Sequence, residues 1–155
     1  MSKKTSLAFI VMVVFCSLLL AAPPDFSGKW VLNKDQSEMR TRDGEKPDIT
    51  MTIEQAADTL KVKQESSSEF MNREYSYKLN GETQEVEGRG GRMSKVTPKW
   101  EGDVLVVSTV REGQQGTTTS TERWQLSADG KTLTIAGKNQ SPRGEFESKM
   151  IYQKQ

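Results

Sequence analysis

Short stretches in which apolar and polar side chains alternate at every second residue constrain this chain more than any other feature. Met51 and Ile53 flank Thr52, and the same period recurs over 75–79 and 132–135. A period of two places one face of a strand against a core and the other in water, which is typical of antiparallel sheets. Beyond residue 22 no long segment has apolar residues at helical spacing. The sequence therefore predicts an all-β domain.

Turn residues divide these stretches into about ten expected strands. Asn80-Gly81 and Asp129-Gly130 are typical of two-residue hairpin turns, in which both positions favour positive φ. Glu101-Gly102-Asp103 and Gly113–Gly116 also indicate turns, whereas the polar segment 34–47 indicates a long loop. The expected strands are 28–33, 48–55, 59–66, 69–79, 82–88, 92–100, 103–112, 117–127, 131–137 and 145–153.

The short links between these strands predict an up-and-down antiparallel meander, in which each strand pairs with the next. An open meander of this length leaves two exposed edges, and closure removes them. We therefore expect a β-barrel of about 8–10 strands, with a sandwich as the alternative. Only 34% of the residues are hydrophobic, which suits a barrel because only its inner face must be buried. The formal net charge of +1 argues against disorder.

The first 22 residues form a separate segment. Lys3 and Lys4 precede an almost continuous apolar run over 7–20, which Ala21-Ala22 follows. This layout predicts a signal peptide over 1–22 and an exported barrel domain over 23–155, located in the periplasm or outside the cell. A retained membrane anchor is the alternative. Cys16 does not fit a lipoprotein site, because bulky Phe15 precedes it, and the remaining chain has no cysteine for disulfides.

Several function classes are excluded or disfavoured by composition. The chain has no histidine, which excludes Ser-His triads and His-ligated metal or haem. Its 22 Lys and Arg residues are balanced by 21 Asp and Glu residues, so we expect no nucleic-acid partner and no membrane-surface role after cleavage. No calcium-loop spacing occurs, and no cofactor or metal site is expected. The chain is expected not to be an enzyme, and an enzyme that uses a buried carboxylate is a further alternative.

Phe26-Ser27-Gly28-Lys29-Trp30 opens the first expected strand. A Gly-x-Trp at this place, soon after an export signal, resembles the lipocalins and their calycin relatives, which include fatty-acid-binding proteins and avidins. In that family the glycine allows a tight entry and the tryptophan closes the narrow end, roles that fall on Gly28 and Trp30. The stretch Glu122–Thr134 is similar to small exported bacterial proteins described as lipocalin-like. The resemblance covers 25–155 and implies a bacterial barrel that binds a small hydrophobic or amphipathic molecule.

Strand parity selects candidate ligand-binding residues. If Tyr75 and Tyr77 face inward, Arg73 does too, and an inward Trp124 likewise places Glu122 inward. Aromatic walls supply affinity for a small molecule, and a few polar groups fix its orientation. Arg73 is expected to engage a ligand carboxylate through paired charge-assisted hydrogen bonds. The residues expected to face a pocket are Arg73, Tyr75, Tyr77, Trp100, Glu122, Trp124 and Tyr152.

An alternative use of the same residues stays open. Trp30, Trp124 and Tyr152 are also typical of ordinary barrel core, and a barrel with a filled interior would act instead through its outer face or loops, on a protein or envelope component. Arg89 and Arg92 flank glycines and indicate either an anion site or a solvated loop. Cavity volume separates the ligand-binding barrel from the filled barrel.

Overall fold

The structure is a computed structural model, and it describes residues 22–41, 44–88 and 91–155. Residues 1–21, which hold nearly all of the expected signal peptide, lie outside the described residues. The expected all-β class is confirmed. Its elements are β1 (Gly28–Leu32), β2 (Ile49–Gln55), β3 (Thr59–Ser66), the 3-10 turn η1 (Glu69–Met71), β4 (Arg73–Lys78), β5 (Gln84–Glu87), β6 (Met93–Glu101), β7 (Val104–Gly113), β8 (Gly116–Leu126), β9 (Thr132–Ser141) and β10 (Gly144–Lys154).

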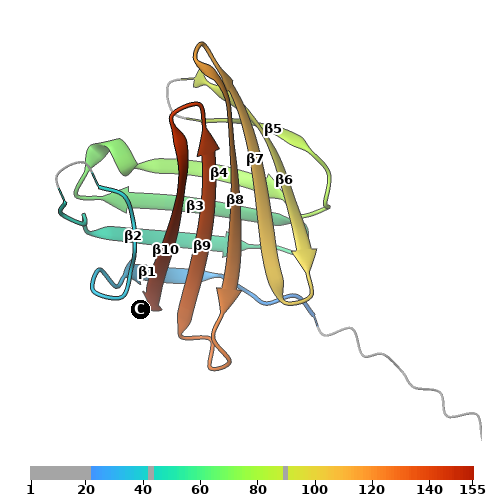
Figure 1. The fold of residues 1–155 in the computed structure, drawn as a ribbon. Coiled ribbons are helices and arrows are strands. Elements are labelled where there is room, and N and C mark those ends of the chain that lie inside the picture. Colours follow the sequence, from blue (N-terminus) through green and yellow to red (C-terminus); the bar gives the residue numbers. More distant parts are fainter. Residues whose placement is uncertain (1–21, 42–43, 89–90) are drawn as a thin grey trace, which may run out of the picture.

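The ten strands form one antiparallel sheet that curls into a nearly closed barrel. The hydrogen-bonded order is β4-β3-β2-β1-β10-β9-β8-β7-β6-β5, so the up-and-down meander is confirmed. The first strand pairs with the last, as Trp30 opposite Lys154 and Leu32 opposite Tyr152. Strands β2–β4 run crosswise to β8–β10, which gives the barrel two faces with an interior between them (Figure 1).

The barrel does not close completely, because β4 and β5 are the two ends of the strand order. The expected hairpin at Asn80-Gly81 is therefore wrong. Gly81 has a φ of 77°, but Asn80 does not have positive φ, and its Oδ1 instead accepts a hydrogen bond from the Glu82 amide (3.1 Å). The side chain of Gln84 takes the place of a strand ladder, since it accepts from the Lys78 amide (2.8 Å) and donates to the Lys78 carbonyl (2.9 Å).

The second expected hairpin, at Asp129-Gly130, does form between β8 and β9. Its geometry differs from expectation, because only Gly130 has positive φ (67°). The carboxylate of Asp129 accepts hydrogen bonds from the Ser127 hydroxyl (2.6 Å) and the Lys131 amide (3.1 Å). These bonds lower the pKa of Asp129 and close a turn in which the glycine alone takes the left-handed conformation.

Two further segments refine the expected boundaries. The strand expected over 69–79 starts only at Arg73, because η1 precedes it and the Gln64 side chain donates to the Met71 carbonyl (2.7 Å). The expected loop at 34–47 holds no strand or helix among its described residues, but it docks on the barrel through an isolated bridge between Glu38 and Lys149. No helix in the described part of the chain is of the length and apolarity that a membrane crossing requires.

The apolar core fills one end of the barrel. Phe26 stacks on Trp100 with ring centroids 5.7 Å apart and meets the edge of Trp124 at 5.9 Å. The Trp30 indole donates to the Phe26 carbonyl (2.8 Å). Each fully buried large side chain contributes about 1.5–3 kcal/mol. The largest fully buried side chains are Phe26, Trp30, Ile49, Met51, Ile53, Leu60, Val62, Leu105, Trp124, Leu133, Ile135 and Tyr152.

Gly28 lies where the chain enters this packed end. Its φ is 135°, which L side chains rarely adopt, and an added Cβ would lie 2.9 Å from Cε of Lys154. The Lys154 ammonium in turn lies 5.2 Å from the Trp30 ring centroid. A side chain at position 28 would therefore strain the backbone and displace the lysine that covers Trp30.

Candidate ligand-binding site

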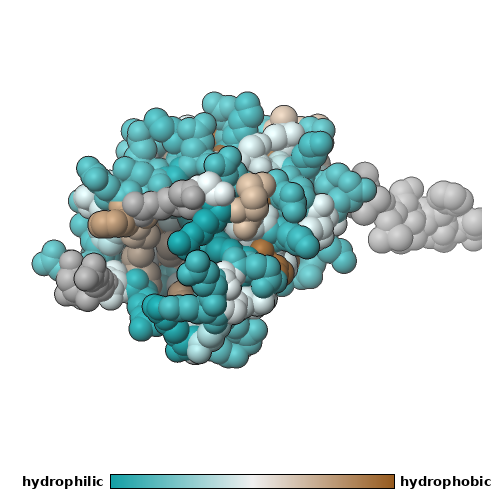
Figure 2. All heavy atoms as spheres, turned by 90° about the horizontal axis from the view of Figure 1, so that it is seen from above, coloured by the Kyte–Doolittle hydropathy of each residue, from teal (hydrophilic) through white to brown (hydrophobic). Residues whose placement is uncertain are grey.

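The other end of the barrel is hollow. A cavity of about 600 Å³ lies between β4 and η1 on one side and β5–β8 on the other. Viewed from above, a depression in which apolar side chains are visible is surrounded by mostly hydrophilic residues (Figure 2). The lining residues are Phe70, Asn72, Arg73, Glu74, Tyr75, Tyr77, Val86, Glu87, Gly88, Ser94, Val96, Thr109, Arg111, Ser120 and Glu122.

The cavity exists because the inner face changes character along the strands. On β8, Trp124 is fully buried in the core, and Glu122 and Ser120 follow it on the same face toward the β7–β8 turn. On β7, Leu105 and Val107 are buried, whereas Thr109 and Arg111 line the cavity. Short or charged side chains cannot fill the interior as the aromatic ones do, so this end remains accessible to solvent.

Arg73 enters the cavity from the start of β4. Its Nη2 donates to Oε1 of the buried Gln64 (3.2 Å), and its guanidinium lies 5.3 Å from the Tyr75 ring centroid. Burial acts to lower the pKa of Arg73, whereas Tyr75, Glu122 and Tyr77 raise it, and the net shift is upward. Arg73 is therefore a permanent cation in the cavity lining, where it remains exposed to solvent. Gln64 is its only hydrogen-bond acceptor among the described residues, which leaves donors for a ligand.

Glu122 supplies negative charge on the opposite wall. Its Oε2 accepts a hydrogen bond from the indole of Trp124 (3.0 Å), so the core tryptophan fixes the carboxylate. The residue across from it on β9 is Gly137, where an added Cβ would lie 2.8 Å from the Ser148 hydroxyl. With no side chain at position 137, Glu122 stays half-buried rather than covered.

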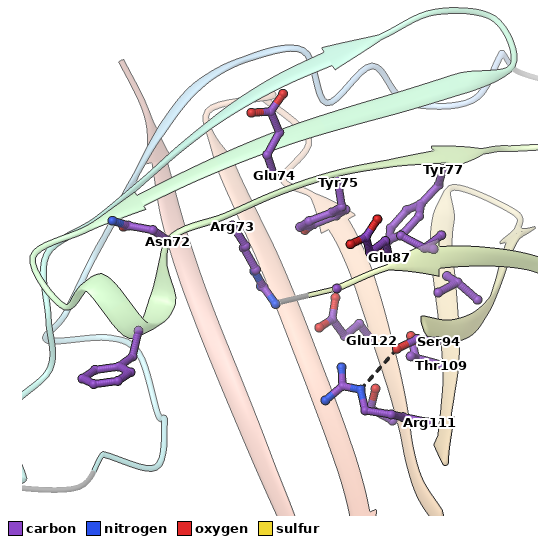
Figure 3. Close-up of a pocket in the computed structure, with 15 residues that line it drawn as sticks. Asn72, Arg73, Glu74, Tyr75, Tyr77, Glu87, Ser94, Thr109, Arg111 and Glu122 are labelled. Atoms are coloured by element: carbon purple, nitrogen blue, oxygen red, sulfur yellow. Dashed lines mark hydrogen bonds between the residues drawn. The ribbon is translucent and has the colours of Figure 1, made fainter. Parts of the chain in front are cut away.

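A second arginine lies near the mouth. Nε of Arg111 donates to the hydroxyl of the buried Ser94 (3.2 Å). The side chains of Arg73, Glu122 and Arg111 extend toward the same part of the cavity, whereas Glu74 points to the other side of its strand (Figure 3). Arg73 on β4, Arg111 on β7 and Glu122 on β8 thus present two cations and a carboxylate to a molecule in the cavity.

The aromatic wall comes from Tyr75 and Tyr77, whose ring centroids lie 4.9 Å apart. Burial raises the pKa of Tyr75 to about 12, with Glu122 adding to the shift and Arg73 opposing it. Burial also raises the pKa of Tyr77 and of Tyr152. All three phenols therefore stay protonated at neutral pH, and Tyr75 and Tyr77 present their rings and hydroxyl groups to the cavity.

The structure brings together four of the seven residues expected to face a pocket: Arg73, Tyr75, Tyr77 and Glu122 line the cavity. It places Trp100, Trp124 and Tyr152 in or against the packed end instead, because the core closes over them before the hollow begins. Trp124 still reaches the site through its bond to Glu122. Contact of any of the seven with a ligand stays a prediction.

Three of the other lining residues, Arg111, Phe70 and Glu87, were not expected. Arg111 shares its inward parity with Leu105 and Val107, so the alternation of that strand carried the signal. Phe70 lies in η1, where the sequence predicts a strand, and Glu87 lies on the edge strand β5. Neither had a sequence signal, because the gap between β4 and β5 was not expected.

Comparison with known proteins identifies the fold. No family model matches the chain, and no curated protein matches its sequence. Among solved structures it is similar to the REP1-NXSQ fatty acid transporter (TM-score 0.62, 17% identity, 84% of this chain and 96% of that chain). It is also similar to apo lipid binding protein 8 of Caenorhabditis elegans (0.65, 16%, 84% and 95%) and to zebrafish ileal bile acid-binding protein complexed with cholic acid (0.60, 19%, 84% and 98%). The chain has a calycin-like barrel fold. At these sequence identities the similarity establishes the fold. The class of ligand has to be inferred from the residues that line the cavity.

Proposed function

We propose that this barrel binds a small amphipathic molecule in its cavity and performs no chemistry on it. The observation that carries the proposal is the hollow of about 600 Å³, which tyrosine rings and charged side chains line together. A volume of this size is in the range of small-molecule sites. The names of the similar structures, a fatty acid transporter and a bile acid-binding protein among them, support the same ligand class.

These lining residues suggest how the ligand lies. Its apolar part packs against Tyr75, Tyr77 and Val96, and an acidic group accepts hydrogen bonds from Arg73. Tyr75 holds the guanidinium by a cation–π contact and Gln64 holds one of its nitrogens, so Arg73 is oriented before the ligand arrives. Orientation in advance reduces the entropy lost on binding.

Calorimetric titration with dodecanoate and with dodecanol tests this arrangement. We expect both to bind one to one, and Arg73→Gln to weaken dodecanoate by roughly tenfold or more while leaving dodecanol unchanged, because only the acid uses the charge-assisted bonds. Arg123→Gln is the matched control, since Arg123 pairs with Glu101 on the outer surface (2.9 Å). Absence of binding by both molecules to the unaltered protein would overturn the proposal.

The filled barrel remains the second candidate, and the packed end around Trp30 and Trp124 favours it for that half of the interior. The hollow half favours a ligand. We also propose that the chain is exported in a bacterium by its first 22 residues, which the basic start and apolar run support. The mass of the mature protein from its own host tests this, since cleavage removes the segment and a retained anchor keeps it.

A further inference from the structure

A second hollow lies next to the mouth of the cavity. It is a groove of about 880 Å³ between the β7–β8 hairpin and the β9–β10 hairpin, and Arg92 also lines it. Its charged lining consists of Arg92, Arg111, Arg143 and Glu112, which leaves two net positive charges. We call it the arginine groove. Three guanidinium groups from separate segments around one hollow form a region that attracts anions.

The arginine groove is held in shape by contacts between the two hairpins. Nη2 of Arg143 donates to Oε1 of Gln115 across the groove (2.8 Å). Gly116 packs so closely on Pro142 that an added Cβ would lie 2.9 Å from its Cγ. Oε2 of Glu112, the acidic residue in the lining, accepts a hydrogen bond from the Thr117 hydroxyl (2.7 Å). The arginines are thus presented by a fixed frame.

Arg111 connects this groove to the cavity, because it lines both. Its Nε is bound to Ser94 inside the barrel, and its two terminal nitrogens have no acceptor among the described residues. Arg111 is therefore within reach of a molecule in either hollow.

We propose that the arginine groove binds the phosphate or sulfate head of an amphiphile whose apolar part lies in the cavity. The inference rests on the proposed function and narrows its ligand class. A carboxylate has two oxygens and one charge, which Arg73 alone can satisfy. A phosphate monoester has three terminal oxygens and up to two charges, and these match several guanidinium groups. Glu122 and Glu87 line the cavity and repel a dianion there, so the head lies outside and the chain inside.

Calorimetric titration of the full chain with dodecyl phosphate, below its micelle concentration, tests the proposal. We expect the double variant Arg92→Gln/Arg143→Gln to weaken dodecyl phosphate by roughly tenfold or more and to leave dodecanoate within about twofold. Arg73→Gln should show the reverse pattern. Arg123→Gln serves as the charge-matched control, and circular dichroism verifies that each variant folds. Because Arg92 and Arg143 are exposed, their loss should not disturb the barrel.

The outcomes separate the two proposals. If the double variant binds dodecyl phosphate with unchanged affinity, the proposed role of the arginine groove is wrong. Binding of dodecanoate would still support the proposed function. If no dodecyl compound binds, the proposed function falls, and the inference that rests on it falls too. Titration with inorganic phosphate distinguishes the source of the anion. Weak binding of inorganic phosphate supports a lipid head, whereas affinity equal to that of dodecyl phosphate shows a site for free anions and contradicts the proposal.

Discussion

Replacement of Trp124 by phenylalanine tests how the packed end of the barrel supports the charged wall of the cavity. Trp124 is fully buried, and its indole donates to Oε2 of Glu122 at 3.0 Å. A hydrogen bond to a charged group contributes about 1.5–3 kcal/mol. The lower value applies here, because Glu122 is half-buried and water in the cavity can hydrate it. The phenyl ring is smaller than the indole, and the loss of the indole's extra buried atoms adds about 1 kcal/mol.

Trp124→Phe should therefore lower the free energy of unfolding by about 2.5 kcal/mol, a large part of the roughly 5–15 kcal/mol that domains have. Urea unfolding followed by far-ultraviolet circular dichroism measures it without depending on tryptophan fluorescence. Trp100→Phe is the control. Trp100 is half-buried, stacks on Phe26 at 5.7 Å and has no indole hydrogen bond among the described residues, so its loss should be about 1 kcal/mol or less.

A double-mutant cycle with Glu122→Ala isolates the hydrogen bond. In the Glu122→Ala background, Trp124→Phe should lower the free energy of unfolding only by the lost packing, about 1 kcal/mol. The coupling energy between the two positions should therefore be about 1.5 kcal/mol. Equal losses for the two tryptophans, together with zero coupling, would refute the reasoning, because both would then contribute through packing alone.

Three other predictions follow from single contacts. Gly28→Ala should destabilise the barrel by about 1–2 kcal/mol in thermal or urea unfolding, because of the positive φ and the close Lys154 Cε; no loss would show that the entry is unstrained. The Lys78 amide donates a hydrogen bond to Gln84 Oε1 (2.8 Å), so Gln84→Leu should speed hydrogen exchange of this amide with little change in global stability. An unchanged exchange rate would contradict this bond. The pKa of Tyr75 is raised from 10.0 to about 12, so its contribution to stability is complete below pH 10 and is lost as pH rises to about 12. Tyrosinate absorbance that already develops around pH 10 in the folded protein would contradict it.

The sequence predicts the strands of this barrel well because alternation and turns are local signals. Met51 and Ile53 face the core as their period requires, and the first and last strands pair as closure requires. The break between β4 and β5 was missed, because Asn80-Gly81 satisfies the local rule for a hairpin. Which turn forms was decided by the hydrogen bond that the Glu82 amide donates to the Asn80 side chain and by the bonds of Gln84 to Lys78, and neither is visible in the residue pattern.

The candidate site was predicted in part for a related reason. Parity predicts Arg73, Tyr75 and Glu122 on the inner face because each precedes an aromatic residue by two positions, and the structure places all three in the cavity lining. Parity does not say how far the core reaches along the barrel axis. The depth of the packed end depends on the T-shaped contact of Phe26 with Trp124, two residues far apart in the sequence, and this put Trp124 and Tyr152 in the core.

Native mass spectrometry of the mature protein from its own host, before and after addition of dodecanoate, tests the central claim most directly. We predict one small molecule per chain, or one bound dodecanoate, and its loss in Ser120→Trp, in which a large ring from β8 fills the cavity. The mass of the bare chain in both spectra, or equal binding by Ser120→Trp, would contradict a ligand inside the barrel.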